Sequence, residues 1–131
     1  MLNRRHILSA LALTAALSFG TASFAMDKKP FDIKAFEAAQ AAGQSILVEV
    51  HAPWCPVCKA QAPILGKLVN EPKFKNMVRF NIDFDSQKNL LQKFNVQKQS
   101  TLIAFKGKQE TGRSTGDTAA ASIETLLAKA I

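Results

Sequence analysis

Two cysteines three positions apart, Cys55 and Cys58, are the residues of this sequence whose type and spacing could carry chemistry. Thiols this close can form a disulfide with each other and exchange it with the thiols or disulfide of a partner. They are the two cysteines of the chain. Two are too few for a disulfide scaffold and enough for a redox pair.

The residues around the pair favour a reactive first sulfur. Ile46 to Val50 has the pattern of a buried strand, and a helical pattern begins at Cys55. A cysteine at a helix start lies beside unpaired N–H groups and the positive end of the helix dipole, which stabilise its thiolate. Pro56 suits the first helical turn, and Cys58 follows nearly one turn later on the same side. We expect Cys55 to be the nucleophile and Cys58 the resolving thiol.

Two other uses of the pair remain open at this point. It could be an inert local disulfide, although closing so short a loop restricts the unfolded chain little. It could also supply half of a four-ligand zinc site, but there is no second Cys-x-x-Cys, and His51 is the one histidine besides His6.

The elements that must position the cysteines alternate between helix and strand. Asp32 is a plausible N-cap and Gly43 a plausible stop for the first helix, and Pro63 should kink the helix that begins at Cys55. This order predicts an α/β fold, with a central mixed β-sheet flanked by helices on both faces. The expected elements are a helix at 33–42, a strand at 46–50, a helix at 55–69, a strand at 77–84, a helix at 86–94, strands at 101–105 and 110–113, and a helix at 118–131.

The first 25 residues read as an export signal ahead of one domain. Arg4 and Arg5 precede an uncharged run from Ile7 to Ala25, which ends on the small-x-small pattern Ser23-Phe24-Ala25. We expect a signal peptide at 1–25, cleaved after Ala25, and a domain at 26–131 in the bacterial periplasm. An uncleaved anchor that faces the periplasm is the alternative. The paired arginines also resemble a twin-arginine signal, so the export route stays open.

The charge of the mature chain argues against nucleic acid as a partner. Without the leader, 15 basic and 10 acidic residues leave a net charge of +5. The lysines are scattered, with no basic run and no interleaved aromatics, as expected of solvated faces.

The sequence resembles the thioredoxin family over residues 30–131. A lone Cys-x-x-Cys would be weak evidence, but here a tryptophan precedes it, a proline follows five residues after the second cysteine, and a Phe-Lys-Gly turn occurs later. The matching segments are Leu47-Val48-Glu49-Val50, Ala52-Pro53-Trp54-Cys55-Pro56-Val57-Cys58-Lys59, Ala62-Pro63-Ile64-Leu65, Asn81-Ile82-Asp83 and Thr101-Leu102-Ile103-Ala104-Phe105-Lys106-Gly107.

The resemblance implies a thioredoxin-like fold and a thiol-disulfide oxidoreductase. The expected enzyme is a monomer that exchanges disulfides with protein substrates, needs no bound cofactor or metal, and is recycled by a membrane redox partner. Its direction of electron flow is open. The residues expected to contact substrate are Trp54, Pro56, Gln99, Ser100 and Thr101.

By the same resemblance, Glu49 occupies the position of a buried acid behind the cysteine pair. Its expected role is catalytic, to accept or relay the proton of Cys58. Burial favours that role, because it raises the pKa of a carboxyl group in general toward neutrality.

The main departure from the family is Ser100, which stands where the family has a cis-proline. A cis bond before a non-proline residue costs on the order of 3 kcal/mol, which weighs against a cis Gln99-Ser100 bond, and the isomer stays open at this point. In the family that proline also keeps metals from the thiolates. An alternative function is therefore a metal or iron-sulfur binding and delivery module that uses Cys55 and Cys58, with His51 as a possible third ligand. Under the redox hypothesis, Ser100→Pro should raise disulfide turnover.

Overall fold

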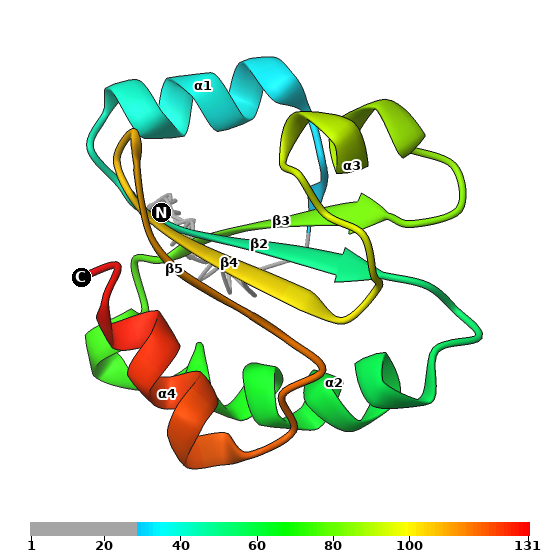
Figure 1. Ribbon diagram of the computed structural model, residues 1–131. Coiled ribbons are helices and arrows are strands. Elements are labelled where there is room, and N and C mark those ends of the chain that lie inside the picture. Colours follow the sequence, from blue (N-terminus) through cyan, green and yellow to red (C-terminus); the bar gives the residue numbers. More distant parts are fainter. Residues whose placement is uncertain (1–28) are drawn as a thin grey trace, which may run out of the picture.

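The computed structural model describes residues 29–131, which form a five-stranded mixed sheet between two layers of helices (Figure 1). The strand order is β1-β3-β2-β4-β5, in which β3 runs parallel to β1 and β2, and β4 runs antiparallel to β2 and β5. The elements are β1 (Lys29–Pro30), α1 (Ile33–Ala41), β2 (Ser45–His51), α2 (Pro56–Leu68), the 3-10 helix η1 (Pro72–Phe74), β3 (Val78–Asp83), α3 (Lys88–Lys93), β4 (Thr101–Lys106), β5 (Gln109–Thr115) and α4 (Ala120–Ala128).

Helices α1 and α3 cover one face of the sheet, and α2 and α4 cover the other (Figure 1). The α/β class and the mixed sheet covered on both faces are thus confirmed. Strand β2 is central and buried along nearly its whole length. Its side chains alternate: Val48 and Val50 join the core under α1 and α3, whereas Leu47 joins the core under α2 and α4.

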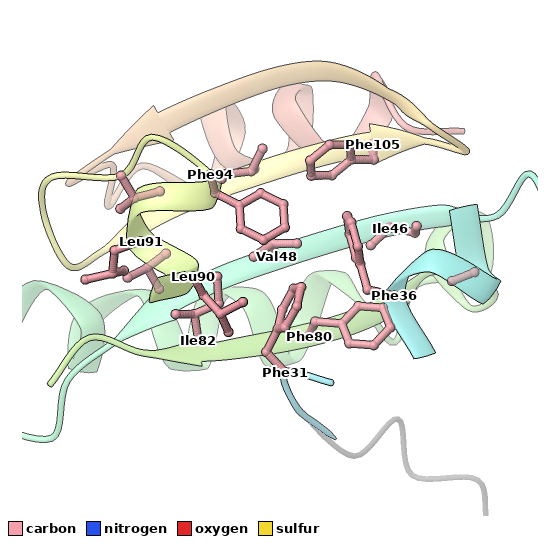
Figure 2. Close-up of a cluster of buried hydrophobic side chains, with 14 residues drawn as sticks. Phe31, Phe36, Ile46, Val48, Phe80, Ile82, Leu90, Leu91, Phe94 and Phe105 are labelled. Atoms are coloured by element: carbon pink, nitrogen blue, oxygen red, sulfur yellow. The ribbon is translucent and has the colours of Figure 1, made fainter. Parts of the chain in front are cut away.

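A cluster of phenylalanines fixes α1 and α3 on the sheet (Figure 2). Their ring centroids lie 5.2–6.2 Å apart in tilted or edge-to-face arrangements, the geometry that aromatic pairs prefer. The members come from the segment before α1, from α1, from β3, from the end of α3 and from β4: Phe31, Phe36, Phe80, Phe94 and Phe105.

A separate aliphatic core holds α2 and α4 against the opposite face. Leu47 and Leu102 of the sheet pack there with Leu65 of α2 and Leu127 of α4, all almost fully buried. Because β2 is anchored between both cores, the loop that follows it presents the start of α2 at a defined place beside the sheet (Figure 1).

Most expected element boundaries agree with the structure within two residues. Asp32 caps α1 as predicted, since its Oδ1 accepts the Ala35 N–H at 2.8 Å. Helix α3 begins at Lys88 because the Asp83 carboxylate instead accepts the N–H groups of Asp85 and Ser86 in a turn. Strand β1 and the 3-10 helix η1 were not expected, and β5 is longer than expected.

The expected signal peptide and its cleavage site lie outside the described residues. Within residues 29–131, no helix has the length and apolar character needed to span a bilayer.

Candidate active site at the start of helix α2

The cysteine pair occupies the N-terminus of α2, as the sequence predicts. Cys55 is the N-cap residue with extended backbone, and Pro56 is the first helical residue. The Cys58 N–H donates to Cys55 Sγ at 3.1 Å. A backbone N–H aimed at this sulfur, together with the helix dipole, favours a thiolate on Cys55 once the pair is reduced.

The two cysteines form a disulfide in this structure, with their Cα atoms 5.3 Å apart. Both are buried, Cys55 completely and Cys58 at 5% exposure. They pack with Ala52, and the partly buried Val57 and Phe84 lie against them. A partner sulfur therefore has to displace part of this cover before it reaches Cys55, since exchange needs direct contact between sulfurs.

Trp54 lies beside the disulfide as an exposed aromatic surface, 55% accessible. Its Nε1 donates to the Asp85 carboxylate at 2.9 Å, and its ring meets Phe84 edge to face. These contacts hold the indole in one orientation next to the cysteine loop. Pro56, the other predicted contact residue of this loop, is also exposed.

The loop before β4 meets the cysteine pair at the carbonyl oxygen of Val50. The Ser100 N–H donates to this oxygen at 2.8 Å, and Cys58 Sγ lies 3.9 Å from it. The reduced Cys58 thiol is thus positioned to donate to the same oxygen. Two predicted site residues that are 42 positions apart, Cys58 and Ser100, are brought together at one backbone acceptor.

Ser100 adopts a left-handed backbone, with φ of +60°, and is 4% exposed. Residues 29–131 contain no cis peptide bond, so the Gln99-Ser100 bond, which the sequence left open, is trans. The Ser100 carbonyl accepts from the Gly116 N–H at 3.0 Å and from Gln61 Nε2 at 3.2 Å. The backbone of this residue is therefore held from α2, β2 and the end of β5.

The residues on either side of Ser100 are also engaged. The Gln99 carbonyl accepts from the Ser100 hydroxyl. Thr101 is buried, and its Oγ1 bonds the Lys98 carbonyl at 2.8 Å and Thr115 Oγ1 at 3.0 Å. The predicted substrate contacts at Gln99, Ser100 and Thr101 stay predictions, and the Gln99 carbonyl and the Ser100 and Thr101 hydroxyls already bond within the protein.

Because of these bonds, we expect Ser100→Pro to destabilise the protein rather than to raise turnover. Proline has no N–H for the Val50 carbonyl, and its φ near −65° is incompatible with +60°. The expected cost in free energy of unfolding is about 2–4 kcal/mol. Ser100→Gly is the matched control, because glycine adopts positive φ without strain and should change stability by less than about 1 kcal/mol. Urea unfolding of both variants measures this, and a Ser100→Pro protein as stable as the wild type would contradict it.

Glu49 is buried behind the cysteine pair and is bound to an arginine. Its side chain is 5% exposed, and its two oxygens accept from Arg79 Nε at 2.8 Å and Arg79 Nη2 at 2.9 Å. A bidentate pair of this kind is among the strongest charge-assisted contacts in proteins. The family resemblance did not predict Arg79 as the counter-ion of Glu49. The proton-transfer role of Glu49 stays a prediction.

His51 ends β2 on the same side as Glu49, and it is half-buried. Within residues 29–131, no group of three or more His, Cys, Asp and Glu side chains is arranged to hold a metal ion. The structure therefore adds no support to the alternative in which His51 joins the two cysteines as a third ligand.

Three residues of the site were not singled out from the sequence: Gln61, Arg79 and Asp85. Gln61 lies three residues after Cys58 on the same side of α2, a polar residue in an inward position. Arg79 interrupts an apolar strand next to a strand that carries one acid, Glu49, and opposite charges in neighbouring buried strands could have indicated a pair. For Asp85, no sequence signal pointed to Trp54.

This fold and this disulfide can be compared with known proteins. The family model described as Thioredoxin matches residues 28–129. The chain belongs to the thioredoxin family. This thioredoxin-family protein is 32% identical over 93 residues to a thioredoxin H-type from Brassica oleracea, covering 71% of this chain and 73% of that one. It is 31% identical over 120 residues to a protein disulfide-isomerase from Humicola insolens, covering 92% of this chain and 23% of that one.

Among solved structures, it resembles the crystal structure of Trxlp from Edwardsiella tarda EIB202. The TM-score is 0.75 with 42% sequence identity, covering 77% of this chain and 98% of that one. Family membership and the Cys55–Cys58 disulfide together establish a thiol-disulfide oxidoreductase. The predicted fold family and enzyme class are thereby confirmed.

Proposed function

We propose that this oxidoreductase is exported to the periplasm, where it exchanges disulfides with folded or unfolded protein substrates through its Cys-Pro-Val-Cys dithiol. Cys55 attacks the substrate disulfide or leaves from the mixed disulfide, and Cys58 resolves it. A membrane redox partner that recycles the dithiol completes the proposal, and the protein acts as a monomer.

The observation that carries the proposed chemistry is the position of Cys55 at the N-cap of α2. There its sulfur accepts a backbone N–H from Cys58, and the sulfur of Cys58 is within disulfide distance. Exposed Trp54 supports protein substrates, because an aromatic surface beside a reactive sulfur offers apolar contact area to a peptide chain.

The test of this chemistry is insulin reduction with dithiothreitol as the electron donor. The protein should precipitate the insulin B chain far faster than dithiothreitol alone, because Cys55 is more reactive than a free thiol. A rate equal to the dithiothreitol background would reject protein disulfides as substrates. The potential of the Cys55–Cys58 couple, measured against glutathione, then decides whether the protein donates or accepts electrons in its compartment.

Export is supported by the leader pattern before the domain, and it predicts a processed protein. Full-length chain expressed in a bacterium should be recovered from the periplasmic fraction without residues 1–25, so that intact-mass analysis finds Met26 as the first residue. Ala25→Pro blocks signal-peptidase cleavage and should leave the uncleaved chain on the membrane. Unprocessed protein in the cytosolic fraction of the wild type would contradict export.

A further inference from the structure

His51 lies between two hollows of the molecule. One is a small pocket of about 10 Å³ behind the cysteine pair, lined by His51 together with Glu49, Cys58 and Gln61. The other is an open surface pocket of about 520 Å³, lined by His51 together with Asn81 and Asp83 of β3. The imidazole thus borders the resolving cysteine on one side and solvent on the other.

The inner pocket has room for about one water molecule between its lining residues. About 10 Å³ is close to the minimum volume that holds one water molecule. Cys58 and His51 both line this space, so a single water in it would lie next to both residues. The outer pocket adds a buried oxygen, Asn81 Oδ1, that has no hydrogen-bond partner within residues 29–131. That oxygen is available to a water that links His51 to bulk solvent.

A carboxylate on the neighbouring strand β3 favours a proton on His51. Asp83 is opposite His51 in the parallel pairing of β2 and β3. Hydrogen bonds from the backbone and hydroxyl of Ser86 mainly lower the pKa of the Asp83 carboxyl, with smaller contributions from the Asp85 N–H and the charge of His51. Asp83 is therefore ionised at neutral pH, and a carboxylate beside an imidazole stabilises the imidazolium form. The second nearby acid is Glu49, and Cys58 faces His51 from α2.

Glu49 also borders the inner pocket, but its oxygens are already used. Both accept hydrogen bonds from Arg79, whose side chain is 10% exposed. A proton placed on Glu49 would break this buried ion pair and leave the arginine charge without a counter-ion, which is costly. Protonation of His51 leaves the Glu49–Arg79 pair intact and is favoured by the Asp83 carboxylate.

We propose that His51 is the general base for Cys58, a role that rests on the dithiol exchange proposed above. In the resolving step the Cys58 thiol gives its proton to the imidazole. The Cys58 thiolate then attacks the Cys55 sulfur of the mixed disulfide. The Cys55–Cys58 bond forms, the bond between Cys55 and the substrate sulfur breaks, and the substrate leaves as a thiolate. Imidazolium releases its proton through the outer pocket, and in the reverse direction His51 returns a proton to Cys58.

The test follows the two thiols separately with the reagent dithiobis-nitrobenzoate in a stopped-flow instrument. Attack by Cys55 on the reagent releases a first thionitrobenzoate, and attack by Cys58 on the resulting mixed disulfide releases a second. His51→Gln should slow the second release about 10-fold or more near pH 7 and change the first by less than about twofold. In the wild type, the second rate should rise with pH through the titration of one group. Asp83→Asn should move that midpoint to lower pH, because it removes the carboxylate that favours imidazolium.

Chemical rescue distinguishes loss of the imidazole group from misfolding of the variant. His51→Ala enlarges a space that is open to the outer pocket, so added imidazole should restore the second release in a saturable manner without changing the first. Cys58→Ser cannot release the second thionitrobenzoate, so its signal gives the amplitude expected when Cys55 reacts alone. The proposal is overturned if His51→Gln keeps the wild-type rate and pH profile of the second release. It is equally overturned if folded Glu49→Gln slows that release more than His51→Gln does.

These results are independent of the proposed protein substrates. The reagent measures the dithiol itself, so loss of the second release in His51→Gln supports the role of His51 even when insulin is not reduced. Failure in the insulin assay with an intact His51 effect therefore rejects the substrate class alone. Failure of the His51 effect with active insulin reduction rejects the base alone.

Discussion

Cys55→Ser is expected to abolish insulin reduction, lowering the rate by at least about 1,000-fold to the dithiothreitol background. Serine keeps the N-cap acceptor for the Cys58 N–H but cannot form a disulfide. The fold should therefore persist while the chemistry is lost. Turbidity from the insulin B chain measures the activity, and far-ultraviolet circular dichroism checks the fold.

Cys58→Ser separates the two thiols further. It retains the nucleophile and lacks the resolving sulfur, so mixed disulfides between Cys55 and substrate proteins should accumulate as bands on a non-reducing gel that dithiothreitol removes. Ala60→Ser is a matched control, because it places a serine on the exposed side of α2 with both cysteines intact. Wild-type activity in Cys55→Ser, or trapping by Ala60→Ser, would contradict the assignment of the nucleophile.

Removal of Arg79 should cause the largest loss of stability, about 3–5 kcal/mol for Arg79→Met. The arginine and Glu49 are 10% and 5% exposed, so the variant removes a bidentate guanidinium from a buried carboxylate. Glu49→Leu should be destabilising for the same reason, since it leaves the guanidinium unpaired. Guanidinium chloride unfolding of the oxidised proteins measures both effects.

The double variant tests the physical cause. Glu49→Leu with Arg79→Met removes both charges and should recover most of the loss, because a buried ion pair replaced by apolar side chains costs little. Lys73 pairs with Glu124 at the exposed surface, so Lys73→Met is a matched control that should have little effect on unfolding. Additive losses in the Glu49 and Arg79 variants would show that the two residues act separately.

The backbone plan could be predicted because each element carries its own local signal. Three elements are specified by contacts between near neighbours in the chain. They are the helix after Asp32, the apolar strand β2, and helix α2, which starts at Cys55-Pro56. Short elements were missed where the signal is not local. Strand β1 contains two residues and exists because β3 provides a pairing edge.

The residues of the candidate site likewise divide into those with a local sequence signal and those placed by distant contacts. Cys55, Cys58 and Trp54 follow from spacing and flanking residues. The sequence left the isomer of the Gln99-Ser100 bond open, and the structure shows that it is trans. The binding of Gln61 to the Ser100 carbonyl joins positions 39 residues apart, and the pairing of Trp54 with Asp85 joins positions 31 apart. No local pattern encodes either contact.

The sequence by itself determined the chemistry of this protein: a dithiol at a helix start, in a chain of the thioredoxin family. Sulfur reactivity depends chiefly on the adjacent helix N-terminus, which is local. The tertiary structure alone decided the surroundings of that dithiol: Arg79 binds Glu49, the Ser100 N–H binds the Val50 carbonyl, and His51 lines the same small pocket as Cys58. Such partners are set by strand register and helix packing, which bring distant residues together and determine which groups a buried charge or proton can reach.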